Sequence, residues 1–341
     1  MPSKSEFPVH GRTVVLTGGS RGLGLAIGRQ LAGKGANIVI VARGHEKLLQ
    51  GQGALNPETQ RFHQISADLT SPSEAVRVVD EVVSWNSGAP PDIVWCCAGT
   101  SHPTLFIDTP VSEFQAQMNN NYFTSLYMAH AILTRWLKAS RRDNTTTPST
   151  TYSTNAQSST PPPARHLIFT ASFLAFYSFT GYSPYSPPKA ALRSLSDCLS
   201  QEMNLYAAAN PNEPPVSVHT IFPASIQGEA FEAENRIKTG LTKMLEEGDA
   251  PQAPDVIALK SIKALESGQE LITTNFTTGL VKRSMLGGSI RGGPLRALGD
   301  WFLASLAAIL MVFVRRDMDQ KVKDWGRKFG TSGMKEDAKA V

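Results

Sequence analysis

Cysteine and net charge are both scarce in this chain of 341 residues. It has three cysteines, of which Cys96 and Cys97 are adjacent in an apolar run, so we expect buried thiols and no disulfide framework. The 33 basic residues nearly balance the 29 acidic ones, and this balance gives no indication of a nucleic-acid partner. Segment 1–11 is polar and has no apolar stretch, so no signal peptide is expected there.

Long apolar runs are also missing from the C-terminal region. The run Trp301–Val314 has fourteen uncharged residues, and as a helix it would extend about 21 Å, less than the roughly 30 Å core of a bilayer. Basic residues flank it on both sides, without the asymmetry of a single span. We therefore expect it to lie in, or dip into, the cytosolic leaflet of a membrane. A true span, a core helix and a dimer contact are the alternatives.

A glycine-rich loop follows the first predicted strand, 13–17, and leads into an apolar-periodic helix. Glycines let the backbone approach a pyrophosphate, and the helix N-terminus supplies N–H groups and a positive dipole. Strand, loop and helix in this order predict a dinucleotide site. Its residues in the loop are Gly18, Ser20, Arg21, Gly22, Leu23 and Gly24.

The second predicted strand, 37–42, is not followed by an acidic residue. In NAD-binding proteins a carboxylate at this point binds the ribose 2′-hydroxyl. Arg43 stands there instead and Arg21 lies in the glycine loop, and two guanidinium groups suit a 2′-phosphate. We therefore predict NADPH as the cofactor, with Lys47 as a further contact. The alternative is that both arginines simply face solvent.

Two further predicted strands end beside the same site. Segment 62–69 runs into Asp68 and Leu69, where the carboxylate would bind the adenine amino group or cap the following helix. Segment 92–97 is followed by Ala98 and Gly99, which are small enough to let the chain pass close to the cofactor. We include these four residues in the cofactor site.

A tyrosine and a lysine follow a short apolar strand, 166–170. Ser172 lies at the end of that strand, and Tyr185 follows thirteen residues later. A helix that begins near Pro184 would place Tyr185 and Lys189 one turn apart. The cation favours the phenolate, and the serine hydroxyl can hydrogen-bond the same oxygen. Such a group can donate a proton to a carbonyl oxygen while a hydride attacks the carbon; a chance Tyr-x-x-x-Lys on a surface helix is the alternative.

Taken together, these motifs resemble those of the short-chain dehydrogenase/reductases over about residues 11–274. The glycine loop matches the family's cofactor motif, and Cys-Cys-Ala-Gly at 96–99 stands where most members have Asn-Asn-Ala-Gly. The resemblance implies that Lys189 binds the nicotinamide ribose and that Asn121 anchors a water that relays protons. It thus implies a catalytic tetrad, namely Asn121, Ser172, Tyr185 and Lys189.

The resemblance also implies roles for the residues after the predicted sixth strand, 216–222. Pro223 would contact the nicotinamide through its backbone, and residues 225–250 would form a mobile lid over the substrate. Within the family the sequence is most similar to fungal enzymes that reduce a long-chain sphingoid ketone, through segments 96–99, 181–185 and 222–223.

The order of elements predicts an α/β fold, a Rossmann-type doubly wound parallel sheet of about seven strands with a C-terminal membrane-associating helical extension. Residues 1–10 would be a tail, 11–274 the NADP-binding reductase domain and 275–341 the extension. One long helix is expected over 110–142. Segment 143–163, which is mostly Thr, Ser, Asn, Gln and Pro, would be a disordered insertion.

We therefore expect an NADPH-dependent reductase of a long-chain sphingoid ketone that uses no metal ion. The resemblance places it at the endoplasmic reticulum membrane, with the catalytic domain facing the cytosol. The apolar face of a predicted helix over 190–206 would pack in the core or in a homodimer interface. The alternatives are a reductase of steroids, retinoids or fatty acyl ketones, and an inactive protein that senses NADPH.

Overall fold

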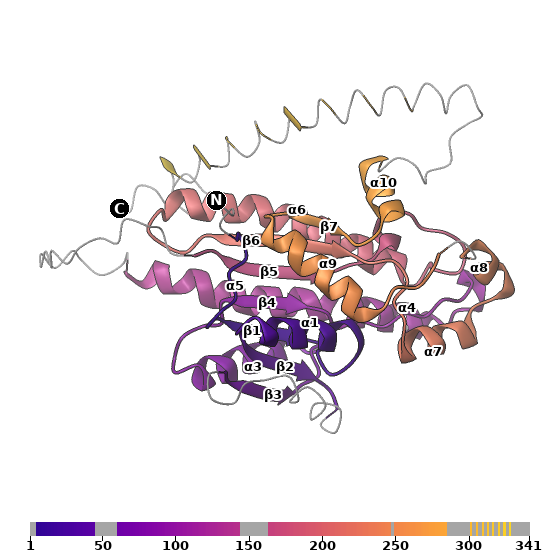
Figure 1. Ribbon diagram of the computed structural model, residues 1–341, viewed down its shortest axis with the longest axis horizontal. Helices are drawn as coiled ribbons and strands as arrows, with labels where there is room; N and C mark the ends of the chain where they lie inside the picture. The colour runs from indigo at the N-terminus through magenta and orange to yellow at the C-terminus, as the bar shows by residue number, and fades with distance from the viewer. Residues whose placement is uncertain are drawn as a thin grey trace, which may run out of the picture.

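The computed structural model describes residues 5–44, 60–143, 163–246 and 249–284, together with isolated positions between 301 and 328. In this part of the chain, seven parallel strands form one sheet in the order β3-β2-β1-β4-β5-β6-β7 (Figure 1). The strands are β1 (Thr13–Thr17), β2 (Asn37–Ala42), β3 (Phe62–Ser66), β4 (Ile93–Cys96), β5 (Arg165–Thr170), β6 (Val216–Phe222) and β7 (Leu271–Thr273). The predicted doubly wound parallel sheet of about seven strands is confirmed.

Helices cover both faces of the sheet, which explains why its strands are almost continuously apolar. Alternate side chains of β1 point to opposite faces: Leu16 packs in the core beneath α1 (Gly22–Gly33) and α9 (Pro254–Glu266). Val15 belongs to the second core, with residues of α3 (Pro72–Trp85) and of the helices that follow β4. The central strands are therefore buried on both faces.

The helix predicted over 110–142 is present, but it changes its hydrogen-bond pattern at three asparagines. It consists of α4 (Val111–Met118), the π-helical turn η3 (Asn119–Phe123) and α5 (Thr124–Asp143). Asparagine is a poor helix former, and single π turns are frequent at functional sites. The wider turn carries Asn121, whose side chain is fully buried.

Helix α6 (Ser186–Ala209) begins immediately after Tyr185. Pro187 and Pro188 lie in its first turn, where backbone N–H groups have no intrahelical acceptor, so the two prolines remove few hydrogen bonds. The N–H of Lys189 donates to the carbonyl of Tyr185 at 3.4 Å. The two side chains are therefore one helical turn apart, as predicted.

The remaining elements gather at the end of the molecule toward which the strands run (Figure 1). They are α7 (Glu229–Ile237), α8 (Gly240–Leu245), α10 (Phe276–Ser284) and the short 3₁₀ turns η2 (Phe106–Asp108) and η4 (Phe173–Ala175). Among the residues that the structure describes, no helix has both the length and the apolar character needed to cross a bilayer. The predicted insertion lies almost entirely outside the described residues, and so does most of the run 301–314.

Candidate active site

Four strand ends meet where the order of the sheet reverses. Strand β1 pairs with β2 on one side and with β4 on the other, and in open parallel sheets ligands bind at the carboxyl ends beside such a point. Gly18 follows β1, Ala98 follows β4 and Ser172 follows β5. Pro223 follows β6 and accepts a hydrogen bond at its carbonyl from the N–H of Phe173, at 2.8 Å. The topology thus brings the predicted cofactor and catalytic segments to one edge.

Gly18 allows the glycine loop to pass directly against the chain that follows β4. Its φ is +68°, and a Cβ atom there would lie 2.8 Å from the backbone of Ala98. Thr17 fixes the same approach, because its hydroxyl accepts from the N–H of Cys97 at 3.1 Å and from that of Ala98 at 3.3 Å. Gly24 lies in the first turn of α1, which begins at Gly22. The loop therefore has the narrow backbone cradle that a pyrophosphate requires.

We expect Gly18→Ala to destabilise the protein by about 2–4 kcal/mol and to weaken NADPH binding. A side chain at positive φ is strained by about 1–3 kcal/mol, and the contact with Ala98 adds overpacking of similar size. Urea unfolding and a fluorescence titration with NADPH measure the two effects. Gly33→Ala is the control, because no atom lies within 4 Å of a Cβ there. A Gly18→Ala protein as stable as the wild type would contradict this account of the loop.

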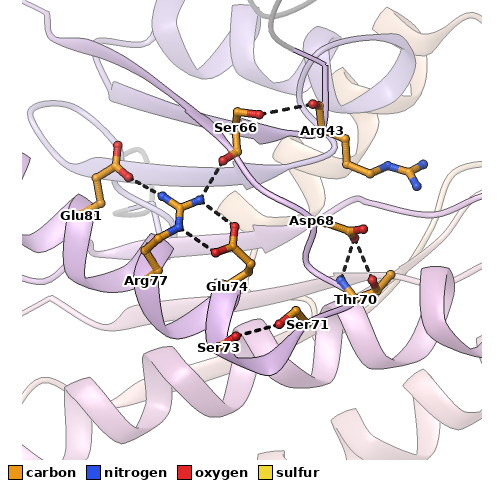
Figure 2. Close-up of polar contacts among 9 residues, drawn as sticks. All are labelled: Arg43, Ser66, Asp68, Thr70, Ser71, Ser73, Glu74, Arg77 and Glu81. Atoms are coloured by element: carbon orange, nitrogen blue, oxygen red, sulfur yellow. Dashed lines mark hydrogen bonds and ion pairs between the residues drawn. The ribbon is translucent and has the colours of Figure 1, made fainter.

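Arg43 and Asp68 lie close together beyond the ends of β2 and β3 (Figure 2). Asp68 Oδ1 accepts from the N–H of Thr70 at 3.1 Å and from its hydroxyl at 2.9 Å. These hydrogen bonds, with a smaller contribution from Arg43, lower the pKa of Asp68. These bonds lie before the N-cap residue of α3, Ser71, so Asp68 does not cap that helix, and its predicted contact with adenine stays a prediction. Leu69 is buried in the core, so only its backbone can reach a cofactor.

The neighbouring Arg77 already forms ion pairs and a hydrogen bond within the protein, whereas Arg43 is exposed. Arg77 pairs with Glu74 and Glu81, each at 2.8 Å, and donates to the carbonyl of Ser66 at 2.8 Å. In Figure 2 the guanidinium of Arg43 extends away from this network. Arg21 is also half exposed and lies 3.8 Å from a carboxylate of Glu229. Ser20 is partly exposed in the same loop, and Lys47 lies outside the described residues.

The four predicted catalytic residues line one cavity of about 470 Å³, namely Asn121, Ser172, Tyr185 and Lys189. The Nζ atom of Lys189 lies 5.6 Å from the centre of the Tyr185 ring and donates to the carbonyl of Thr170 at 3.0 Å. The hydroxyl of Ser172 accepts from the N–H of Leu174 at 3.2 Å. The predicted contacts Leu23, Gly99 and Pro223 line the same cavity.

Asn121 holds the loop after β4 against this cavity. Its amide donates to the carbonyl of Thr100 at 2.8 Å and to the backbone and side-chain oxygens of Gln117, both at 3.0 Å. Its oxygen accepts from the N–H of Thr100 at 3.2 Å. A Cβ atom at Gly99 would lie 2.7 Å from that oxygen and 3.2 Å from Nζ of Lys189, so this position has no room for a side chain.

The expectation that Lys189 makes Tyr185 acidic is wrong for this structure. Burial raises the pKa of Tyr185, the charge of Glu234 raises it further, and hydrogen bonding with Ser172 opposes the change. Burial also lowers the pKa of Lys189 to about 8. The reason is desolvation, which penalises both charged forms and is the largest cause of each shift. The buried Tyr185 is therefore a protonated phenol, the form that a proton donor needs.

A charged cluster within segment 225–250 lies at the same cavity, and its role was not predicted from the sequence. Lys238, whose side chain is only 1% exposed, pairs with Glu246 at 2.7 Å and with Glu234 at 3.7 Å. Glu246 also accepts a hydrogen bond from the hydroxyl of Tyr182, three residues before Tyr185. Only the spacing of Glu234 and Lys238 by four residues was visible in the sequence, and that spacing is common on exposed helices.

The fold and this site define a class of protein. A family model described as short chain dehydrogenase matches residues 12–145. The solved short-chain dehydrogenase from Streptomyces avermitilis shares the fold, with a TM-score of 0.63 at 21% identity over 87% of this chain and 98% of that one. The alcohol dehydrogenase of Thermococcus sibiricus, complexed with 5-hydroxy-NADP, has a TM-score of 0.56 at 18% identity and covers 77% and 94%. The chain belongs to the short-chain dehydrogenase/reductase family.

Its similarity to particular members is much closer. It is 45% identical over 338 residues to the 3-ketodihydrosphingosine reductase ksrA of Aspergillus fumigatus, a match that covers 96% of this chain and 88% of the relative. It is 38% identical to the 3-ketodihydrosphingosine reductase gsl-3 of Neurospora crassa, with 96% and 86% covered. The predicted resemblance to fungal reductases of a long-chain sphingoid ketone is confirmed.

Proposed function

We propose that this chain reduces the C3 ketone of 3-ketodihydrosphingosine to the alcohol of dihydrosphingosine, with NADPH as the reductant. The observation that carries the proposal is the meeting of Ser172, Tyr185 and Lys189 on one cavity at the switch point of the sheet. Two relatives with this activity in their names align with 96% of the chain. Phe173, Phe179 and other aromatic side chains line the cavity and suit a lipophilic ketone.

The cofactor would supply the hydride, and the protein's own residues would direct it and supply the proton. The backbone of the glycine loop at Gly18 and the N-terminus of α1 would hold the pyrophosphate. Lys189 would bind the nicotinamide ribose, and Ser172 would hydrogen-bond the carbonyl oxygen. Tyr185 would donate its proton to that oxygen. Asn121 would complete the relay that returns a proton to Tyr185.

The test of this proposal is a panel of lipophilic carbonyl compounds of different shape. Purified protein is supplied with NADPH and with 3-ketodihydrosphingosine, a steroid ketone, a retinal or a fatty acyl ketone, and cofactor oxidation is followed. We expect 3-ketodihydrosphingosine to have the highest kcat/KM of the panel. A higher value for any of the other three would assign the chain to that alternative substrate.

NADPH is preferred over NADH in this proposal because Arg43 and Arg21 would both bind the 2′-phosphate. We expect Arg43→Ala to raise the KM for NADPH about tenfold or more, since hydrogen bonds to charged groups contribute roughly 1.5–3 kcal/mol. The KM for NADH should change less than about twofold, because NADH has no phosphate there. Arg29→Ala, which removes an exposed arginine of α1, is the control. An equal rise with both cofactors would contradict the role of Arg43.

We further propose that the chain acts at the endoplasmic reticulum membrane, with its catalytic part facing the cytosol. The described positions Trp301, Ile309, Val312 and Phe313 are helical and more than half exposed, which supports contact with lipid. A homodimer is proposed through a surface formed by residues of α5 and α6. There Leu126, Leu195 and Leu199 line an apolar groove of about 350 Å³, and Leu192 and Met203 are buried in the core.

A further inference from the structure

Carboxylates are unusually frequent in the wall of the cavity that holds Tyr185. Glu234, Glu246 and Asp249 line it, whereas Lys189 is the one cation among the described lining residues. Lys189 is placed for the cofactor ribose and already donates to the carbonyl of Thr170. A cavity for a neutral ketone has no need of three acids, because each acid loses hydration there and Lys238 is shared between two of them. The wall is therefore suited to a ligand that brings a positive charge.

Two of the three carboxylates already have close partners within the protein. Glu246 pairs with Lys238 at 2.7 Å and accepts from the hydroxyl of Tyr182, and Asp249 accepts from the N–H of Ser225 at 3.3 Å. Glu234 is held more loosely, because Lys238 lies 3.7 Å away and is shared with Glu246. Burial raises the pKa of Glu234 to about 7, Lys238 opposes this rise and the charge of Glu246 adds to it. Glu234 is thus the less closely paired of the two acids that share Lys238.

Glu234 lines the same cavity as the proton donor Tyr185. Its charge also contributes to the raised pKa of Tyr185. In the proposed substrate the carbon next to the ketone carries an ammonium group. When the ketone oxygen accepts a hydrogen bond from Tyr185, that ammonium is attached to the carbon next to the carbonyl carbon, inside the cavity that the carboxylates line. An acid of this wall with an incomplete ion pair, such as Glu234, can offer the ammonium an opposite charge.

We propose that Glu234 binds the ammonium group next to the ketone, and that this ion pair makes the site selective for α-amino ketones over plain long-chain ketones. The inference rests on the proposed ketone reduction and assigns Glu234 a role in substrate recognition. The bound ammonium supplies a second positive charge for the two acids that share Lys238. It also offsets the negative charge of Glu234, which raises the pKa of Tyr185.

The experiment compares two ketones of equal chain length, 3-ketodihydrosphingosine and the same hydroxyketone without the amine. The full chain is used as the wild type and as Glu234→Gln, which keeps the shape of the side chain and removes its charge. We expect kcat/KM for the amino ketone to fall about 10- to 30-fold in the variant, because truncating one partner of a buried charge pair commonly costs this much or more. For the ketone without the amine we expect a change of less than about twofold.

Two controls separate recognition from folding. Glu232→Gln removes an exposed carboxylate from the same helix and should leave both ketones unaffected. A fluorescence titration with NADPH should give the same affinity for Glu234→Gln as for the wild type, which shows that the cofactor half of the site is folded. Glu234→Asp, which restores the charge, should recover part of the selectivity for the amino ketone.

Three outcomes would overturn the inference. An equal loss for both ketones would show that Glu234 acts on Tyr185 or on packing and not on the ammonium. No loss for either ketone, or no preference of the wild type for the amino ketone, would show that the ion pair does not form. Failure of the wild type to reduce either ketone is a different result, because it would overturn the proposed function on which the inference rests.

Discussion

Tyr185→Phe is expected to lower kcat for ketone reduction by at least about a thousandfold, since proton transfer by a positioned side chain contributes roughly 10²–10⁴-fold. The ring, whose centre lies 6.1 Å from that of Tyr182, remains, and only the phenolic oxygen is lost. NADPH binding should therefore stay within about twofold of the wild type, because the cradle at Gly18 does not involve that oxygen. Single-turnover kinetics with 3-ketodihydrosphingosine and a fluorescence titration with NADPH measure the two quantities.

Tyr127→Phe provides the matched control for this substitution. Tyr127 lies on α5 and stacks against Phe123, away from the residues that line the cavity. Loss of its hydroxyl should leave turnover unchanged. Retained activity in Tyr185→Phe, or an equal loss in both variants, would remove Tyr185 from the proposed mechanism.

The second large effect is expected at Lys189, where activity and stability should change in opposite directions. Lys189→Met removes the ammonium that would hold the nicotinamide ribose, and we expect kcat/KM to fall by about a thousandfold or more from the loss of both cofactor positioning and transition-state electrostatics. Steady-state kinetics with NADPH in excess, together with the affinity for NADPH, separates poor binding from poor chemistry. A variant that keeps more than about a tenth of the wild-type kcat/KM would contradict this role.

The same substitution is expected not to destabilise the fold at pH 7. Burial lowers the pKa of Lys189 from 10.5 to about 8, which corresponds to roughly 3 kcal/mol of destabilisation while the ammonium is charged. The Thr170 carbonyl loses its donor in the variant, at a cost of about 1 kcal/mol or more. We therefore expect the free energy of unfolding of Lys189→Met to equal that of the wild type or to exceed it by up to about 2 kcal/mol.

The pH dependence of this difference has a definite sign. Below pH 8 both the folded and the unfolded wild type carry the charged lysine, and the full burial penalty applies. Between about pH 8 and 10.5 the folded protein loses this proton before the unfolded chain does, so the wild type gains stability relative to the variant. Urea unfolding at pH 7 and pH 10 tests this, and a variant that is much less stable than the wild type at pH 7 would be the opposite result.

The sheet could be predicted from the sequence because a strand that is buried on both faces appears there as a nearly continuous apolar run. Strands such as β1 and β2 are continuous apolar runs, and each is followed by turn or helix residues. The site could be assembled for the same reason, since Gly18, Ala98, Ser172 and Pro223 all follow strand ends that a parallel sheet brings to one edge.

What the sequence did not predict depends on burial and on contacts between distant segments. Lys189 lies one turn from Tyr185, but how far both are buried decides the direction of their pKa shifts, and burial is a property of the whole fold. The contact of Tyr182 with Glu246 joins residues 64 positions apart, and no local sequence pattern indicates such a contact. The role of Asp68 was open between two readings because capping and ligand binding use the same carboxylate chemistry.

The most direct test of the account follows the hydride itself. NADPH labelled with deuterium at the transferred position is supplied with 3-ketodihydrosphingosine, and the product is analysed by mass spectrometry. The account predicts dihydrosphingosine with a single deuterium at C3 from the wild type and none from Tyr185→Phe. Unlabelled alcohol from the wild type, or labelled alcohol formed at the wild-type rate by Tyr185→Phe, would contradict it.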